Sequence, residues 1–391
     1  MGQQDPVPLQ QGADPRGPLH LAVLLSFSGA GGVERMVMNL VRELAAMPGL
    51  RLDLLSIRAD GPHLTAIPAN VRWLPLQAGH TLTAIPALVR YLCREKPQAL
   101  LVAKDRAGRA ALMARQLAGV DCRVVIRLGT NLSAALKNRS GIRRWWRTLP
   151  MRWLYPLVDR VVAVSDGVAR DTVAITGLPA ARVTVIRNPV ITPGLLAQAQ
   201  APVAHPWLNL KTVPVIMGAG RLSDQKDFLT LLEAFAQVRR QRDCRLMILG
   251  EGGLRAALEQ RVAALGLDAV VSLPGFQADL PAWLQKADLF VLSSRWEGSP
   301  NVLTEALALG VPVVATACPS GPDEVLAQGR FGPLVPVGDV GRLAQAMLDT
   351  LAQPLPGAEL QQAVQAYRAD RSAREYLAVL QGLPGGRSCA A

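Results

Sequence analysis

Residues 288–316 constrain the fold of this chain more than any other segment. They contain two short apolar runs, Leu289–Leu292 and Val311–Ala315, separated by a Gly-Ser-Pro-Asn turn and by the stretch Val302–Leu309, which predicts a helix. Short apolar runs on either side of a helix are typical of a parallel β-α-β unit, because helices cover both faces of a parallel sheet. We therefore expect an α/β fold here.

Two carboxylates lie in this segment with seven residues between them. Glu297 comes just before the predicted helix and Glu305 lies on it. Unpaired backbone N–H groups at a helix N-terminus attract anions, phosphate above all. A carboxylate cannot bind that phosphate, so we expect Glu297 to accept hydrogen bonds from neutral hydroxyls. The arrangement suits a sugar joined to a nucleotide through a diphosphate. The alternative is that both residues are ordinary solvated acids at a sheet edge.

Strands and helices alternate along the rest of the chain, which predicts doubly wound α/β domains. A chain of 391 residues is too long for one core, so we expect two domains. We assign residues 1–18 to a disordered leader, 19–190 to an N-terminal domain, 191–359 to a C-terminal domain and 360–391 to a terminal helix, expected over residues 360–380, and a tail. Further strands are expected at residues 19–26, 53–57, 99–103, 122–128, 160–164, 183–186, 213–218, 245–249 and 270–273.

A loop after the strand 213–218 carries two cations, Arg221 and Lys226, at the mouth of the next predicted helix. Two cations in this position would neutralise a diphosphate leaving group, on which charge develops as a glycosidic bond breaks. The alternative is a pair of exposed cations in an ordinary loop. A dinucleotide-binding Gly-x-Gly-x-x-Gly is excluded because its sixth position is Ser223, and because the following strand, from Arg245 into Gly250, does not end in an acid.

These segments, together with Gly310-Val-Pro-Val-Val314 and Cys318-Pro-Ser-Gly-Pro-Asp-Glu-Val-Leu326, resemble the retaining glycosyltransferases of family four. The Gly-Arg-Leu-x-x-x-Lys spacing around Arg221 is similar to an element of that family. The resemblance covers about residues 19–380 and is most specific from Gly218 to Leu326. It implies the GT-B architecture, in which two Rossmann-like doubly wound domains face a cleft and a terminal helix returns to the N-terminal domain.

The resemblance also implies roles for individual residues. Arg221, Lys226 and Glu297 would be catalytic, with Glu297 on the transferred sugar, and Glu305 would accept the ribose hydroxyls. The glycines of the first loop would meet the donor diphosphate or the reacting centre, and the backbone N–H groups at the helix start would meet the phosphates. The base would lie in the loop after strand 270–273, where the alternative is a turn beside an ordinary core Phe. The donor-binding residues implied in this way are Gly31, Gly32, Gly250, Glu251, Phe276, Gln277, Gly298, Ser299, Asn301, Val302, Leu303 and Glu305.

The chain departs from the family in the N-terminal domain. Many relatives have a His after the strand that ends at Leu128, whereas this chain reads Arg-Leu-Gly-Thr-Asn over residues 127–131. The identity of any acid or base that replaces the His is left open. The departing phosphate could itself take the acceptor's proton on the same face, which is compatible with retention. Candidates on the acceptor side are Lys104, Asp105, Arg127, Thr130 and Asn131.

Charge is divided unevenly between the two halves. Residues 1–190 contain 25 Lys and Arg against 12 Asp and Glu, whereas the remainder contains 17 against 18. The basic half indicates an anionic partner. Residues 137–155 hold six cations and no acid, interleaved with Trp and Tyr, a composition that suits a membrane headgroup region. The alternative is an amphipathic helix with core tryptophans. Membrane-contact candidates are Arg143, Arg144, Trp145, Trp146 and Arg147.

Other features narrow the expected function. The five Cys and four His have no metal-ligand spacing, so we expect neither a metal nor a cofactor, only a nucleotide-diphosphate sugar as substrate. No apolar run is long enough to cross a membrane. We expect a cytoplasmic enzyme at the inner face of the membrane, acting on a lipid-linked or anionic glycan. Alternatives are a sugar-nucleotide epimerase and, with less support, a nucleic-acid-binding protein. The sugar, base, acceptor, linkage and oligomeric state are not encoded in these patterns.

Overall fold

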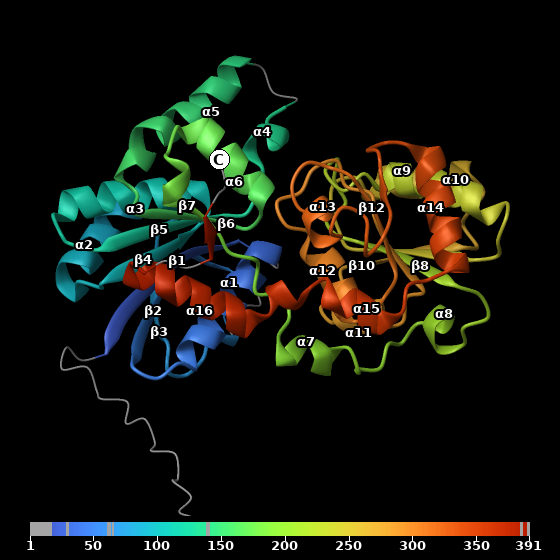
Figure 1. Cartoon of the computed structure of the whole chain (residues 1–391), viewed down its shortest axis with the longest axis horizontal. Coiled ribbons are helices and arrows are strands. Elements are labelled where there is room, and N and C mark those ends of the chain that lie inside the picture. Colours follow the sequence, from blue (N-terminus) through green and yellow to red (C-terminus); the bar gives the residue numbers. More distant parts are fainter. Residues whose placement is uncertain are drawn as a thin grey trace, which may run out of the picture.

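The computed structural model of the chain describes residues 18–28, 31–60, 64, 66–137, 141–383 and 386–388. The predicted leader lies outside these residues, apart from Pro18. Two α/β domains lie side by side, each built on one sheet (Figure 1). The expected doubly wound fold class is confirmed.

The N-terminal sheet has the order β14-β7-β6-β5-β4-β1-β2-β3, and only β14 is antiparallel to its neighbour. The central strand β4 is buried along its whole length, as expected of a strand covered on both faces. The strands are β1 (Leu19–Ser28), β2 (Leu50–Asp60), β3 (Arg72–Pro75), β4 (Ala99–Ala103), β5 (Arg123–Leu128), β6 (Arg160–Ala163), β7 (Val183–Val185) and β14 (Arg387–Ser388). The helices are α1 (Gly32–Ala45), α2 (Ile85–Glu95), α3 (Asp105–Ala118), α4 (Leu132–Ala135), α5 (Gly141–Leu154) and α6 (Asp166–Thr176).

The C-terminal sheet is parallel throughout, in the order β10-β9-β8-β11-β12-β13. Its central pair, β8 and β11, is the pair whose loops carry Lys226 and Glu297. The strands are β8 (Val215–Ala219), β9 (Arg245–Leu249), β10 (Val271–Gly275), β11 (Leu289–Leu292), β12 (Val313–Thr316) and β13 (Leu334–Val335). The helices are α7 (Pro193–Gln198), α8 (Pro206–Asn209), α9 (Phe228–Arg239), α10 (Arg255–Ala264), α11 (Leu280–Gln285), α12 (Asn301–Ala308), α13 (Pro322–Val325) and α14 (Val340–Ala352).

The terminal segment is broken, and the expectation of one helix over residues 360–380 was wrong. It forms α15 (Gly357–Gln362), a 3-10 turn at Gln365–Tyr367 and α16 (Ala369–Gln381). The break occurs because the Tyr367 carbonyl accepts hydrogen bonds from Val190 N and Ile191 N, each at 3.0 Å, and the Ile191 carbonyl accepts one from Ala369 N at 2.9 Å. The two segments in which the chain passes from one domain to the other are therefore hydrogen-bonded to each other.

The helix α16 lies on the N-terminal domain, although residues of the C-terminal domain precede it (Figure 1). Its residues Ala373, Tyr376 and Val379 are buried in the same core cluster as Leu21 of β1 and Val125 of β5. The last helix thus completes the hydrophobic core of the first domain.

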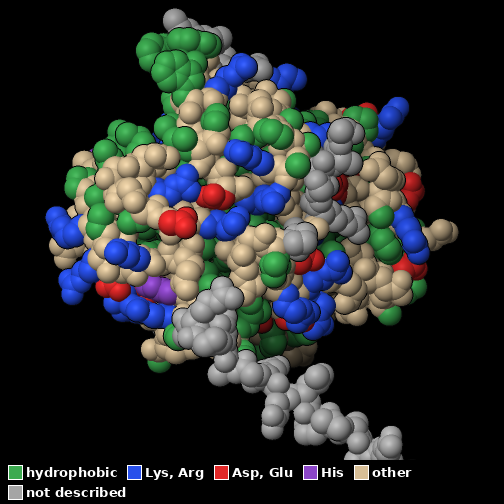
Figure 2. All heavy atoms as spheres, turned by 60° about the vertical axis from the view of Figure 1, so that its left-hand side comes forward, with side chains coloured by type: hydrophobic (Ala, Val, Ile, Leu, Met, Phe, Trp, Pro, Cys, Tyr) green, Lys and Arg blue, Asp and Glu red, His purple; other side chains and the backbone are tan. Residues whose placement is uncertain are grey.

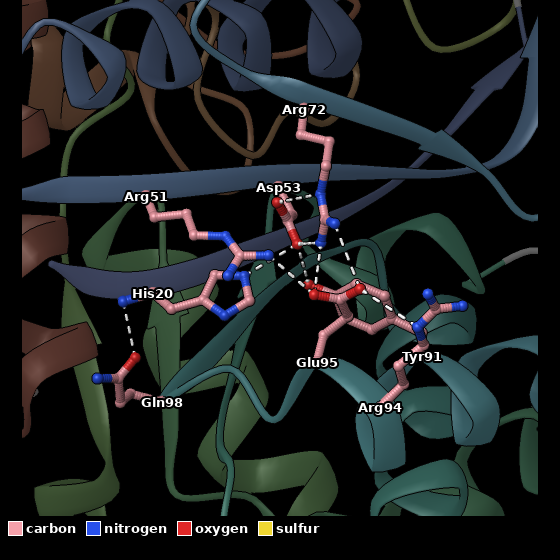
Figure 3. A network of polar contacts seen from close by, with 8 residues as sticks. All are labelled: His20, Arg51, Asp53, Arg72, Tyr91, Arg94, Glu95 and Gln98. Carbon is pink, nitrogen blue, oxygen red and sulfur yellow. Dashed lines mark hydrogen bonds and ion pairs between the residues drawn. The ribbon is translucent and has the colours of Figure 1, made fainter. Parts of the chain in front are cut away.

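A buried polar network lies near the amino-terminal ends of β1 and β2 (Figure 3). The fully buried Asp53 accepts hydrogen bonds from Tyr91 Oη at 2.7 Å and from Arg72 Nε at 3.0 Å, and its Oδ2 lies 2.9 Å from His20 Nε2. Glu95 joins the network through Arg72 and Arg51. Because loops to the other domain leave the opposite, carboxyl-terminal ends of these parallel strands, the network serves the stability of the N-terminal domain.

Candidate active site

The core of the candidate site is an ion pair at the carboxyl-terminal ends of β8 and β11. Lys226 Nζ lies 2.6 Å from Glu297 Oε1, and Ser294 Oγ donates to the same oxygen at 2.7 Å. Both charged side chains are largely buried, with 16% and 7% of their surface exposed. The sequence pattern gave no indication that Glu297 has protein partners of its own. Its orientation is fixed before any ligand arrives.

The other predicted catalytic cation, Arg221, lies on the same loop but is exposed. The loop is shaped by close packing: a Cβ on Gly250 would lie 2.0 Å from the Gly220 carbonyl oxygen, and Gly250 has a positive φ of 136°. These glycines hold the loops after β8 and β9 together. Glu251 is half-exposed and pairs with Arg255 at 2.7 Å.

The loop after β10 contains the two residues expected to meet a nucleobase. Phe276 has 56% of its surface exposed, which leaves its ring free to stack. Gln277 Nε2 donates to the Pro274 carbonyl at 3.0 Å and so stays close to the strand end.

The N-terminus of α12 presents backbone N–H groups. No side chain caps this N-terminus, and Pro300 precedes the first helical residue, Asn301. Leu303 is fully buried in the core, so only its backbone can serve a ligand. Val302 is partly exposed, and Ser299 Oγ is buried without a hydrogen-bond partner among the described residues.

Glu305, on the same helix, is almost completely buried and forms an ion pair with Arg35 of α1 in the other domain. Burial raises the pKa of Glu305, and the charge of Arg35 opposes that shift. The sequence identified Glu305 but did not indicate that its partner is Arg35, which lies 270 residues away.

The loop ends of the two domains touch at several further points. Asn188 Nδ2 donates to Asn301 Oδ1 at 2.7 Å, and Asn131 Nδ2 donates to Ser320 Oγ at 2.8 Å. A Cβ on Gly32 would come within 3.5 Å of Asn301 Nδ2. Gly32 at the start of α1 therefore faces the start of α12, whereas a Cβ on Gly31 would meet Glu34 of its own helix.

Glu324 of α13 makes the most connected contact between the domains. Its carboxylate accepts the backbone N–H groups of Asp166 at 2.8 Å and Gly167 at 2.9 Å, at the start of α6, and it pairs with Arg187. A carboxylate suits this position because the helix N-terminus and a guanidinium both favour negative charge. The sequence indicated a motif here but not its partner in the other domain.

A pocket of about 220 Å³ opens in the N-terminal domain beside these contacts. Four of the five acceptor-side candidates line it: Lys104, Asp105, Arg127 and Thr130. The fifth, Asn131, contacts Ser320 instead. Asp171 of α6 also lines the pocket and was not predicted. The remaining lining residues are Val33, Leu128, Gly129, Leu132, Met151, Thr172 and Ile175.

The polar groups of this pocket are held in place by neighbours. Lys104 Nζ lies 2.7 Å from Glu34 Oε1, and Asp105 pairs with Arg109 at 3.0 Å. Arg127 is buried and donates to Asn188 Oδ1 at 2.5 Å. Asp171 Oδ2 accepts from Leu132 N at 2.6 Å and Ser133 N at 3.2 Å. The pocket is therefore preorganised.

The helix α5 connects this pocket with the surface. Met151 is buried and lines the pocket, whereas Trp145, Trp146 and Trp153 have 52%, 66% and 76% of their surface exposed. The alternative of core tryptophans was therefore wrong. Hydrophobic side chains and cations gather on the projecting top of the molecule in Figure 2, where Figure 1 places α5. The side chains of Arg143, Arg144 and Arg147 lie outside the described part of the chain.

Two kinds of feature are absent from the described part of the chain. No helix there has both the length and the apolar character needed to span a bilayer. No group of three His, Cys, Asp or Glu residues among the described residues is placed to hold a metal ion.

Comparison with known proteins gives a family match for each domain. Residues 30–192 match the model of Glycosyltransferase Family 4, and residues 213–353 match the model of Glycosyl transferases group 1. Between them the two models match most of the chain: the first contains β2 to β7 of the N-terminal sheet, and the second contains the whole C-terminal sheet.

Individual relatives agree with this match. A Campylobacter jejuni subsp. jejuni serotype O:2 protein, N-acetylgalactosamine-N,N'-diacetylbacillosaminyl-diphospho-undecaprenol 4-alpha-N-acetylgalactosaminyltransferase, is 30% identical over 62% of this chain and 64% of its own length. The lipopolysaccharide core biosynthesis glycosyltransferase LpsE of Rhizobium meliloti is 36% identical over 36% of this chain and 40% of its own length. The chain thus spans less than two-thirds of these relatives.

The fold is matched over a larger part of the chain. The crystal structure of Anabaena Alr3699/HepE in complex with UDP and glucose superposes with a TM-score of 0.75, covering 93% of this chain and 100% of that chain at 19% identity.

Proposed function

We propose, from the premise that this chain belongs to the family 4 (group 1) glycosyltransferases of GT-B architecture, that it transfers a sugar from a nucleotide-diphosphate donor to a glycan acceptor and retains the anomeric configuration. The observation that carries this proposal is the buried contact between Lys226 and Glu297, at 2.6 Å. In this contact a cation lies beside a carboxylate that can accept hydrogen bonds from hydroxyl groups. Both side chains lie at the strand ends that face the other domain.

In this proposal the C-terminal domain holds the donor. The base lies against Phe276 and Gln277, the ribose on Glu305, and the diphosphate at the N–H groups that begin α12. Lys226 and Arg221 stabilise the negative charge that develops on the leaving diphosphate, which is where preorganised cations lower a transition state most. Glu297 accepts hydroxyl groups of the transferred sugar. Its hydrogen bonds from Lys226 and Ser294 keep it in one orientation.

The N-terminal pocket receives the acceptor. Retention follows if the acceptor hydroxyl attacks on the face from which the diphosphate leaves, and the leaving phosphate takes the proton of that hydroxyl. The bond from the anomeric carbon to phosphate then breaks as the bond to the acceptor oxygen forms. No side chain has to act as a nucleophile. Because the leaving phosphate takes the proton, the chain does not need the His that is absent from residues 127–131 to act as a base.

We further propose that the acceptor is lipid-linked and that the enzyme works at the cytoplasmic face of a membrane, in the synthesis of a cell-surface polysaccharide or lipopolysaccharide. By its name, the Campylobacter relative acts on a sugar attached to diphospho-undecaprenol. In this chain, α5 combines exposed indole rings with a side chain that lines the acceptor pocket. Contact of α5 with anionic lipid would bring a membrane-bound acceptor to that pocket.

The test is transfer from each of a set of nucleotide sugars to lipid-linked acceptors, followed by chromatography of the product. We expect one donor to be used, and NMR of the product to show the anomeric configuration of the donor. The variants Glu297→Gln and Lys226→Ala should lose most turnover, and full turnover in both would overturn the site assignment. Isomerisation of a donor without an acceptor would instead favour an epimerase, and salt-sensitive retention of DNA or RNA without sugar transfer would favour nucleic-acid binding.

A further inference from the structure

The pair formed by Arg35 and Glu305 joins helix α1 of the N-terminal domain to helix α12 of the C-terminal domain. Arg35 Nη2 donates to Glu305 Oε1. The Glu305 side chain is only 1% exposed, whereas that of Arg35 is 31% exposed. The carboxylate is thus a buried group of the C-terminal domain whose cation comes from the N-terminal domain.

The second oxygen of this carboxylate is available. Glu305 Oε2 is buried and has no hydrogen-bond partner among the described residues. A buried acceptor without a donor is unfavourable, so a ligand hydroxyl that reaches it would bind favourably. Glu305 can therefore keep its bond to Arg35 and still accept a hydrogen bond from a ligand.

The charge of Arg35 decides whether Glu305 is a good acceptor. Burial favours the neutral acid and raises the pKa of Glu305 above its ordinary value, and the charge of Arg35 limits that rise. Of the elements packed on α12, α11, β11 and β12 carry no titratable residue, while α15 carries Glu359 and α13 carries Asp323 and Glu324. Within the described part of the chain, Arg35 is the charge that acts on Glu305.

We propose that Arg35 is a positioning residue for the nucleotide: it holds Glu305 as an ionised, oriented carboxylate that accepts the ribose hydroxyls. This inference rests on the proposed function, because it assumes that the ligand is a nucleotide. It adds that ribose recognition by one domain requires a side chain of the other. Tight nucleotide binding and approach of the two domains are then a single linked event.

The experiment is calorimetric binding of nucleoside diphosphates to the full chain between pH 5.5 and 8.5. Four proteins are compared: the wild type, Arg35→Met, Arg35→Lys and Arg42→Met. Arg42 is an exposed residue of the same helix and serves as the matched control. The wild type and the control should bind with nearly constant affinity over this range.

Arg35→Met should bind at least tenfold more weakly at the low end of the range. Its affinity should recover as the pH rises, because Glu305 without its cation stays protonated to a higher pH and a protonated carboxyl is a poorer acceptor. Arg35→Lys should restore the flat profile. The 2′-deoxy and 3′-deoxy nucleoside diphosphates should bind the wild type more weakly than the ribose form, and this difference should disappear in Arg35→Met at low pH.

The outcomes separate the two proposals. If no nucleoside diphosphate binds the wild type, the proposed function fails. A second outcome is that a nucleoside diphosphate binds, but the affinity of Arg35→Met does not change with pH and the deoxy ligands still bind it more weakly than the ribose form. The proposed function then stands and the role of Arg35 is refuted. If Arg35→Met does not fold, Arg35→Gln also removes the charge, keeps a hydrogen-bonding group and is held to the same expectations.

Discussion

Lys226 and Glu297, which are 71 residues apart in the sequence, form a largely buried ion pair with Nζ 2.6 Å from Oε1. Each side chain holds the other in place, so both charges are already paired before a ligand binds. A sugar diphosphate that enters this site meets a cation and a carboxylate already oriented against each other. Substitution of one partner consequently changes both.

Lys226→Ala should lower the turnover number for sugar transfer by about 100-fold, the usual loss when one preorganised group that stabilises developing charge is removed. The Glu297 carboxylate also loses its fixed orientation. The measurement is initial rate at saturating donor. Lys211→Ala is the control, because Lys211 pairs with Asp288 on the surface of the same domain, at 2.8 Å, with both side chains about one-third exposed. A Lys226→Ala enzyme as fast as this control would contradict the prediction.

Gly298→Ala should block the close approach of the two domains. A Cβ on Gly298 would lie 2.1 Å from the Gly129 carbonyl oxygen and 2.9 Å from Thr130 Cα, and backbone atoms cannot move aside as a flexible side chain can. We expect turnover to fall at least about tenfold, equivalent to about 1.4 kcal/mol in the barrier, while nucleoside diphosphate affinity changes less. Gly253→Ala is the matched control, since a Cβ there meets no atom within 4 Å. Equal kinetics for the two variants would show that this contact is not needed.

Asp53→Asn should destabilise the N-terminal domain. Burial opposes ionisation of Asp53, but hydrogen bonds from Arg72, Tyr91 and His20 outweigh it and keep its pKa below the ordinary value of 3.8. The stability that ionised Asp53 contributes is therefore complete above pH 3.8 and is lost as the pH falls through the lower, folded-state pKa.

At pH 7 we expect Asp53→Asn to lower the free energy of unfolding by about 3 kcal/mol, as when one partner of a buried charged pair is removed. Urea unfolding curves at pH 7, 5, 4 and 3 measure this. The difference in the free energy of unfolding between wild type and variant should be constant from pH 7 to 5 and become smaller below pH 4. A difference that stays constant down to pH 3 would show that the charge of Asp53 is not the source of its contribution to stability.

The double substitution Trp145→Ala and Trp146→Ala should weaken binding to vesicles of anionic phospholipid by about tenfold or more. Indole rings supply large apolar areas, and each buried Å² contributes about 25 cal/mol. Sedimentation of the protein with vesicles measures the partition coefficient. Leu117→Ala removes a side chain of the same domain that is 70% exposed but lies on α3, so it should bind like the wild type. Unchanged binding of the double variant would argue against α5 as the contact.

Much of the fold was predictable, because parallel strands covered on both faces appear as apolar runs. The strands β4 and β9 begin and end at the predicted residues. The strand β3 was missed because it lies at a sheet edge, where three of its four residues are exposed and no apolar run is needed. The break before α16 was missed because it depends on hydrogen bonds to Val190 and Ile191, far away in sequence.

The candidate site was predictable within one domain but not between domains. Lys226 and Glu297 follow strand ends, and Glu305 lies on the helix that comes next, which is a local pattern. Their polar environment is not local: Arg35 reaches Glu305 from 270 residues away, and Glu324 meets Arg187 from 137 residues away. Such contacts follow from how two separately folded sheets are placed together, and no spacing in the sequence records that placement.

The return of α16 has a consequence for how the chain matures on the ribosome. Residues 373–380 and the edge strand β14 belong to the first domain but are translated after the C-terminal domain. The C-terminal domain can complete its hydrophobic core while the core of the N-terminal domain still lacks α16. The domain that is translated first is then the second to finish folding. During that interval apolar surface around Leu21 and Val125 stays uncovered, and unfinished surfaces of this kind are the ones that chaperones shield.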